Sequence, residues 1–321
     1  MPGPATAPER VPPPGQIVLV FQGGGALGAY QVGVYQALHE AGIEPDWVIG
    51  TSIGAINAAI IAGNPRERRM AQLEKFWESL EWRAPFGLAN HAAARTDLWN
   101  PWANLTTIVQ GVAGFFAPNP SSWWGVHTPL GVEHAAYYTT APLRRTLNAL
   151  IDFDLPNRCR PRLTVGAVNA RTGEMRYFDS RFNPLQADHV MASGALPPAF
   201  PAVRIDGEPY WDGGVYSNTP IETVLDDNPR RDSTIFSVHL WNPNGSEPDT
   251  IWQVLGRQKD IQYASRVVSH VARQKQIHHL RHVITQMADR MPEGLRNNAD
   301  VRELASWGCR TTMHIVRMSA P

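Results

Sequence analysis

The first sixty residues most constrain the fold, because two short apolar runs alternate with two segments of helical spacing. Residues 16–21 (QIVLVF) and 47–49 (WVI) have the character of strands buried on both faces. Between them, apolar residues recur every three or four positions from 27 to 41, and Gly42 ends that pattern. A helix-length crossover between buried strands predicts a parallel sheet flanked by helices.

A serine lies where the second strand turns into the next helix, in the stretch GTSIG. Gly50 and Gly54 leave room for a tight turn on either side of Ser52, and the helix that follows favours negative charge beside it. Ser52 is therefore a candidate nucleophile. A glycine-rich turn with an incidental serine is the alternative.

The loop after the first strand, GGGALG, allows two interpretations. As a dinucleotide-binding loop it requires an acidic residue at the end of the second strand, but Asp46 stands at the start of that strand. As an oxyanion hole it offers free backbone N–H groups at a helix N-terminus, beside the turn that carries Ser52. We favour the oxyanion hole, formed by the N–H groups of Gly24, Gly25 and Ala26, with Gly28 supporting the loop.

Two residues compete as the base for Ser52. His239 would fit the order serine, acid, histidine in which α/β-hydrolases carry their catalytic residues along the chain. However, it lies inside an apolar strand, where a histidine usually belongs to the core. Asp212 follows a hairpin signal at residues 203–211, and Gly213 and Gly214 let the chain turn away from its carboxylate. An aspartate that only serves the turn is the alternative for Asp212.

Four stretches together resemble the patatin-like phospholipase family: GGGALG, GTSIG, ASGALPPAFPAV and the DGG of YWDGGVYSNTP, within residues 16–225. The resemblance implies a three-layer α/β/α sandwich with a mainly parallel central sheet, and a Ser-Asp dyad without histidine. It implies Ser52 as nucleophile and Asp212 as general base, and no metal or cofactor. It also implies that the oxyanion hole lies in the region of Gly23, Gly24, Gly25 and Ala26. One position departs from the family, whose members often have Arg or Lys where this chain has Leu27; this weakens the case for an anionic headgroup at the site.

The rest of the chain divides by composition. Residues 1–15 hold six prolines and predict a disordered leader, and residues 16–321 a single domain. Within it, residues 83–140 predict an insertion rich in Trp, which could pack as a cap, line an acyl pocket or contact a membrane peripherally. Residues 191–200 predict a helix. Residues 250–321 predict a helical extension, with a long helix over 251–287 and a final strand over 312–318.

Composition narrows the class of protein further. A formal net charge of zero argues against nucleic acid as a partner. The chain has only two cysteines and no apolar segment like a signal peptide, which favours a cytoplasmic location. No apolar window reaches the ~20 residues of a membrane span. His278 and His282 share a helix face but lack an acidic third ligand in an HExxH-like position, so we expect no metal site.

The sequence thus predicts a serine esterase that cleaves fatty-acyl esters through an acyl-enzyme. The alternative is a lipid- or protein-binding module on the same fold. The oligomeric state, headgroup and acyl length are not indicated.

Overall fold

The computed structural model describes residues 13–80, 111–112, 114–158 and 161–320. The predicted leader therefore falls almost entirely outside the described residues, as do residues 83–110 of the predicted insertion.

The centre of the molecule is an eight-stranded sheet with the order β10-β9-β1-β2-β5-β8-β7, in which β6 also pairs with β5. β10, β9, β1, β2 and β5 are parallel, and β6, β7 and β8 join through antiparallel pairings. The bounds are β1 Gln16–Phe21, β2 Trp47–Thr51, β5 Arg162–Asn169, β6 Met175–Asp179, β7 Val203–Ile205, β8 Glu208–Asp212, β9 Ser233–His239 and β10 Met313–Ser319. The predicted mainly parallel sheet is confirmed.

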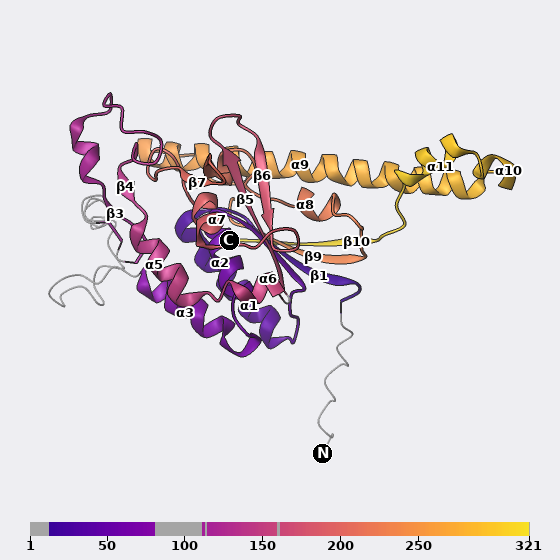
Figure 1. Cartoon of the computed structure of the whole chain (residues 1–321), viewed down its shortest axis with the longest axis horizontal. Helices are drawn as coiled ribbons and strands as arrows, with labels where there is room; N and C mark the ends of the chain where they lie inside the picture. The colour runs from indigo at the N-terminus through magenta and orange to yellow at the C-terminus, as the bar shows by residue number, and fades with distance from the viewer. Residues whose placement is uncertain (1–12, 81–110, 113, 159–160, 321) are drawn as a thin grey trace, which may run out of the picture.

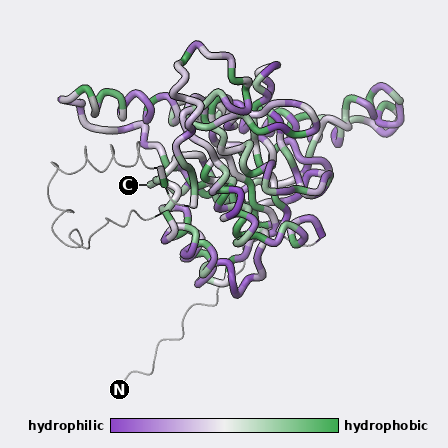
Figure 2. Tube along the Cα trace, turned by 60° about the vertical axis from the view of Figure 1, so that its left-hand side comes forward, coloured by the Kyte–Doolittle hydropathy of each residue, from purple (hydrophilic) through white to green (hydrophobic). Residues whose placement is uncertain are grey.

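Helices cover both faces of this sheet (Figure 1). One face buries its apolar residues against α1, α2, α3, α5 and α7, and the other packs against α8 and α9. Figure 2 shows the hydrophobic segments gathered inside the body between these layers. The helices of the three-layer sandwich are α1 Ala29–Glu40, α2 Ile53–Ala62, α3 Arg69–Ser79, α5 Ala141–Leu150, α6 Asp154–Arg158, α7 Ala187–Ser193, α8 Glu222–Leu225 and α9 Ile251–Arg290.

The helix α9 extends well beyond the sheet and carries two short helices, α10 (Glu293–Arg296) and α11 (Ala299–Ser306), at its far end (Figure 1). The chain then returns along α9 to form β10, which pairs with β9 at the edge of the sheet. Two short strands, β3 (Ala117–Pro118) and β4 (Tyr138–Thr139), form a separate ribbon. Among the described residues, none of the helices combines the length and apolar character that crossing a membrane requires.

The predicted helix over residues 191–200 is wrong in its bounds. The helix α7 ends at Ser193, and the chain is irregular from Gly194 to Ala202, where β7 follows. Prolines 197 and 198 cannot supply the backbone N–H groups that a continuing helix needs, which explains the early end. Ser193 is therefore the last residue of the helix, and its side chain is buried.

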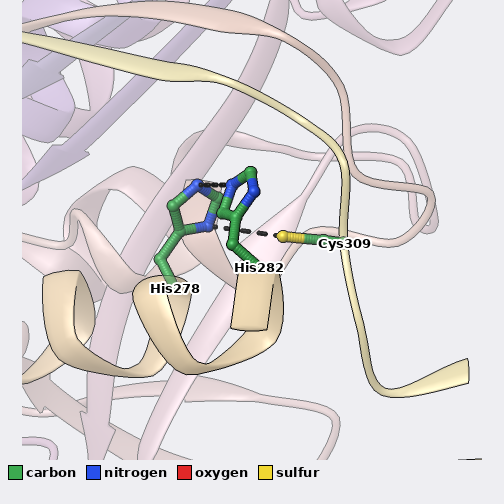
Figure 3. A group of neighbouring side chains, drawn as sticks. All are labelled: His278, His282 and Cys309. Carbon is green, nitrogen blue, oxygen red and sulfur yellow. Dashed lines mark hydrogen bonds between the residues drawn. The ribbon is translucent and has the colours of Figure 1, made fainter. Parts of the chain in front are cut away.

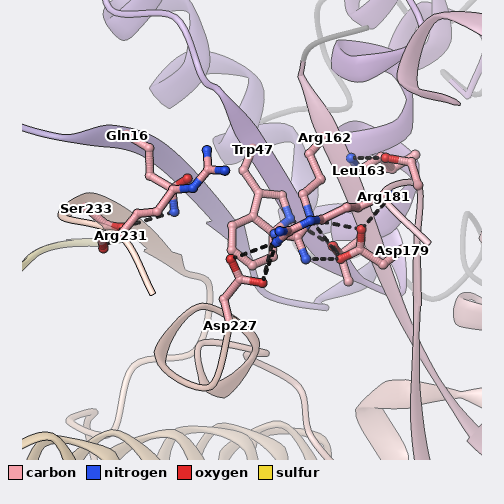
Figure 4. A network of polar contacts seen from close by, with 11 residues as sticks. Gln16, Trp47, Arg162, Leu163, Asp179, Arg181, Asp227, Arg231 and Ser233 are labelled. Carbon is pink, nitrogen blue, oxygen red and sulfur yellow. Dashed lines mark hydrogen bonds and ion pairs between the residues drawn. The ribbon is translucent and has the colours of Figure 1, made fainter. Parts of the chain in front are cut away.

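A charged network closes the end of the sheet where β2 and β5 begin (Figure 4). The Arg162 guanidinium lies 3.7 Å from the centroid of the Trp47 ring and pairs with Asp179 at 2.7 Å and with Asp227 at 3.0 Å. Asp179 also accepts a hydrogen bond of 2.6 Å from Thr164. Both carboxylates are buried, so Arg162 neutralises charge that water does not reach.

Replacement of Arg162 by Ala is expected to lower the free energy of unfolding by about 3 kcal/mol, because it leaves the buried Asp179 without its cation and Asp227 with Arg181 alone. Arg171→Ala is the matched control, since its pair with Glu208 is exposed and is expected to contribute below about 1 kcal/mol. Urea unfolding of both variants measures the difference. Equal losses in the two variants would contradict the assignment.

Candidate active site

The stretch GTSIG forms a tight turn between β2 and α2, with Ser52 at the helix N-cap. A Cβ added at Gly50 would lie 2.2 Å from the carbonyl oxygen of Gly54, and one added at Gly54 would lie 2.5 Å from that of Phe21. Glycine is required at both positions because the strands and the helix meet backbone to backbone. The predicted strand, turn and helix are confirmed here.

Ser52 has φ 57° and ψ −128°, a conformation that L residues rarely adopt. Two contacts hold it. The Ser52 N–H donates to the Ser193 hydroxyl at 3.0 Å, and that hydroxyl donates to the Gly166 carbonyl of β5 at 2.6 Å. Ser193 is fully buried, so this bridge fixes the serine turn to the neighbouring strand without competition from water.

Asp212 ends β8 directly beside the serine turn. Its carboxylate accepts a hydrogen bond of 2.7 Å from the Gly214 N–H, and the Ser52 side chain lies beside it. Burial raises the pKa of the Asp212 carboxyl from 3.8 to about 7, and the interactions with the Ser52 side chain and the Gly214 N–H oppose that shift. The structure therefore brings the two predicted catalytic residues into contact, and the aspartate has the proton affinity of a base that works near neutral pH.

The hairpin predicted before Asp212 is present, with Asp206 and Gly207 at its turn. The following glycine, Gly213, lies against β5, and a Cβ there would be 2.5 Å from the Gly166 carbonyl oxygen. The same carbonyl thus contacts Gly213 and accepts from Ser193. Gly166 of β5 therefore contacts both the segment that follows Asp212 and, through Ser193, the turn that carries Ser52.

The glycine loop lies at the same end of the sheet, because Phe21 of β1 is in register with Gly50 of β2. The Gly23 N–H donates to the Asn218 carbonyl at 3.2 Å, so it is occupied. Within the part of the chain that the structure describes, the N–H groups of Gly24, Gly25 and Ala26 donate to no other residue. Of the four residues predicted for the oxyanion hole, these three therefore keep an N–H that could bind an oxyanion.

Asn218 and a buried amide network hold this loop in place. The Asn218 side chain donates to the Gly23 carbonyl at 2.8 Å. On the other side, Asn57 of α2 donates to the Gly28 carbonyl at 3.0 Å and to Gln31 at 2.9 Å, and Gln31 donates to the Gln22 carbonyl at 2.6 Å. The loop is thereby tied to the same helix that Ser52 begins.

An apolar cavity of about 430 Å³ opens onto Ser52. Two aromatic side chains from the described end of the predicted insertion, Phe115 and Phe116, form one wall, and Phe200 packs 5.4 Å from Phe116, measured between ring centroids. The rest of the lining is Gly25, Ala26, Ile53, Ile56, Trp77, Leu80, Val112, Gly194 and Leu196. A cavity of this kind accommodates an apolar chain next to the serine.

The structure does not bring the alternative base to the site. His239 lies on β9, and β1 separates that strand from β2 and Ser52. Its ring contacts Ser237 at 3.0 Å, and burial followed by the charge of Arg317 lowers the pKa of His239 to about 4. Asp46 bonds to the Ile17 N–H where β1 and β2 begin, at the edge opposite the glycine loop, so it supports no ribose site.

Comparison with known proteins places this arrangement in a family. The profile described as patatin-like phospholipase matches residues 19–225, which span the glycine loop, the serine turn and Asp212. The chain belongs to the patatin-like phospholipase family. A second profile, described as patatin phospholipase, matches residues 261–321, the region of α9 to β10. The fold implied by the resemblance is therefore confirmed.

Curated relatives of this patatin-like protein are similar over short stretches. Patatin-like phospholipase domain-containing protein 6 of Mus musculus is 31% identical over 129 residues, which cover 33% of this chain and 10% of the relative. Triacylglycerol lipase ptl3 of Schizosaccharomyces pombe is 39% identical over 102 residues, which cover 32% of this chain and 18% of the relative. Lysophospholipase nte1 of Aspergillus terreus is 61% identical over 44 residues, which cover 14% of this chain and 3% of the relative. The chain thus matches a fifth or less of each of these relatives.

Among solved structures, VipD from Legionella pneumophila is similar with a TM-score of 0.37 and 16% sequence identity, covering 96% of this chain and 62% of that one. The family assignment rests on the sequence match.

Sequence reasoning did not single out two residues of the site, Ser193 and Asn218. Both lie inside stretches that carry the family resemblance, ASGALPPAFPAV and YWDGGVYSNTP. Their partners are backbone atoms 27 and 195 residues away in the chain. Only the folded arrangement shows what these polar side chains contact.

Replacing Asp212 by Asn is expected to stabilise the fold at high pH. Because the pKa of Asp212 in the folded protein, about 7, exceeds its ordinary 3.8, the folded state binds the proton more tightly, and stability falls as pH rises between these values. The variant should therefore gain free energy of unfolding over wild type at about pH 8, and lose most of that gain at about pH 4. Urea unfolding at both pH values measures this.

Asp206→Asn is the matched control, since Asp206 is exposed at the turn of the same hairpin. Its effect should not depend on pH in this way. A pH-independent difference between Asp212→Asn and wild type would show that the carboxylate is not destabilised by burial.

Proposed function

We propose that this protein is a serine acyl hydrolase that cleaves fatty-acyl esters through a Ser52–Asp212 dyad and an acyl-enzyme. The observation that supports it best is the buried Asp212 carboxylate beside the side chain of Ser52, which itself lines an apolar cavity. Family membership supports the broader class of lipid acyl hydrolase. A purely binding module would need neither a strained serine nor a base beside it.

In the first half-reaction, Ser52 Oγ attacks the ester carbonyl carbon while Asp212 accepts the hydroxyl proton. The carbonyl oxygen becomes an oxyanion that the amides of Gly24, Gly25 and Ala26 can bind, each donor contributing ~3 kcal/mol to lowering the barrier. The carbon–oxygen bond to the alcohol then breaks, and Asp212 returns the proton to the leaving oxygen. An ester between Ser52 and the fatty acid remains.

In the second half-reaction, Asp212 takes a proton from water, and the resulting hydroxide oxygen attacks the acyl carbon. Collapse of the second tetrahedral intermediate releases the carboxylic acid, and the proton passes back to Ser52 Oγ. The pKa of about 7 suits both roles, because the same group must accept and return a proton in each half-reaction.

The cavity supports a long acyl chain as the bound part of the substrate. Its walls are aliphatic and aromatic, and Leu27, where family members often have a cation, is 44% exposed on the short 3-10 helix Gly25–Gly28. The site thus selects for the acyl chain through apolar contact. Two of the relatives bear the names lysophospholipase and triacylglycerol lipase, which agrees with fatty-acyl esters as the substrate class.

We also propose that the protein contacts lipid surfaces through the described part of the predicted insertion. Trp123 and Trp124 are 89% and 77% exposed, and Val126 beside them is 77% exposed. Indole rings favour the boundary between water and lipid. Such a contact would bring the cavity close to its substrate.

Ser52→Ala is expected to lower kcat/KM for long-chain p-nitrophenyl esters by roughly a thousandfold or more, because the nucleophile is lost. Ser306→Ala on the exposed face of α11 is the control and should keep wild-type activity. Release of p-nitrophenol, and of fatty acid from phospholipid vesicles, measures the rates. Wild-type turnover in Ser52→Ala would refute the mechanism.

Labelling by a fluorophosphonate separates the enzyme from the binding module, since the reagent requires an activated serine. Wild type should label and Ser52→Ala should not. Lipid binding by a wild-type protein that neither labels nor turns over esters would favour the binding module.

Phe116→Ala is expected to reduce kcat/KM for a long-chain ester by about tenfold, because the acyl chain loses an apolar wall contact. The acetyl ester should be unaffected, since its chain is too short to reach that wall. Phe182→Ala is the matched control, because Phe182 is 67% exposed and lies near Arg162. An equal loss on both esters would mean that Phe116 supports the fold and not the acyl chain.

A further inference from the structure

Two histidines of α9 and a cysteine from a distant segment converge at one place (Figure 3). His278 and His282 stand one helical turn apart on the same face. Cys309 belongs to the segment between α11 and β10, where the chain returns past the helix. The sequence alone indicates only the histidine pair, because the third residue is 27 positions further along the chain.

The three side chains offer ligand atoms that all lie within 4.8 Å of one another. The His278 and His282 Nε2 atoms are 3.1 Å apart, and the Cys309 Sγ lies 3.7 Å from the His278 Nδ1. Around a tetrahedral zinc ion, bond lengths of 2.0–2.1 Å to nitrogen and 2.3 Å to sulfur give ligand separations of about 3.4 Å and about 3.6 Å. The two contacts use different nitrogens of His278, of which only one can bind an ion. With one ligand atom per residue the three lie within 4.8 Å of one another, so the side chains would close by about 1 Å to reach the tetrahedral separations.

Backbone contacts fix the cysteine against the helix independently of the histidines. The Cys309 N–H donates to the Arg281 carbonyl at 3.3 Å, and the Thr285 hydroxyl donates to the Cys309 carbonyl at 3.0 Å. Cys309 is buried, and a Cβ at the preceding Gly308 would lie 2.3 Å from the Thr285 hydroxyl oxygen. The thiol is thus presented to the histidine pair by a closely packed backbone.

The chemistry of these donors selects the class of ion. A thiolate and two neutral imidazoles are ligands that zinc prefers, and three protein ligands leave the fourth tetrahedral position to water.

We propose that His278, His282 and Cys309 form a zinc-binding site that fastens α9 to the segment leading into β10. β10 pairs along its whole length with β9, and β9 pairs with β1, whose end carries the glycine loop. The ion would therefore stabilise the return of the chain to the sheet. It takes no part in the ester chemistry proposed above, which uses residues at the far ends of β2 and β8.

The test measures zinc bound to the purified full-length chain after dialysis against zinc chloride and then against buffer, by mass spectrometry of the metal. Wild type is expected to retain one zinc ion per chain. Cys309→Ser and His278→Ala should each weaken zinc affinity at least tenfold in a competition titration with a chromogenic chelator. Cys159→Ser, which removes the other thiol of the sequence, and His279→Ala, on the exposed side of α9, are the controls and should retain the ion.

Two further readouts keep the proposal falsifiable if a variant folds poorly. Cobalt added to the metal-free wild type should give a thiolate charge-transfer absorption and the intense visible bands of tetrahedral coordination, both absent in Cys309→Ser. A chelator should lower the melting temperature of wild type but not of Cys309→Ser, because only the bound ion is linked to folding. No zinc uptake by wild type, or equal uptake by wild type and Cys309→Ser, would overturn the proposal.

Discussion

The site depends on the unfavourable backbone conformation of Ser52, which places its side chain at the carboxyl end of β2. Such a conformation costs of order 1–3 kcal/mol and persists only where the surroundings determine it fully. Here the close approach of Gly50 and Gly54 to neighbouring backbone, and the hydrogen bond from the Ser52 N–H to Ser193, hold the chain in this conformation. The geometry of the serine is thus a property of the packed sheet.

Burial makes the Asp212 carboxylate more basic than it is in water. The carboxylate lies at the end of an antiparallel strand, against the parallel strand β5, with the Gly214 N–H as hydrogen-bond donor and the Ser52 side chain beside it. These two groups compensate only part of the lost hydration, so the carboxylate remains more basic than it is in water. In the proposed mechanism this buried acid is the base, and the structure places His239 on β9, which β1 separates from β2.

Local patterns predicted much of this arrangement. The strand 16–21 appears with the predicted bounds, and the predicted helix 251–287 forms as α9, because their apolar spacing and flanking residues agree with the final fold. What the sequence did not reveal depends on long-range contacts: the early end of α7, the roles of Ser193 and Asn218, and the approach of Cys309 to His278. Each needs partners that only the folded sheet assembles, and Gly23, expected among the oxyanion donors, has its N–H occupied by Asn218.

The most direct test of the account is to trap the acyl-enzyme. Wild-type protein mixed with a long-chain p-nitrophenyl ester is quenched in acid within the first turnovers, digested, and mapped by mass spectrometry. The account predicts one fatty-acyl adduct, on the peptide that contains Ser52, in wild type. Steady hydrolysis with the adduct on another residue would contradict the central claim that Ser52 is the nucleophile.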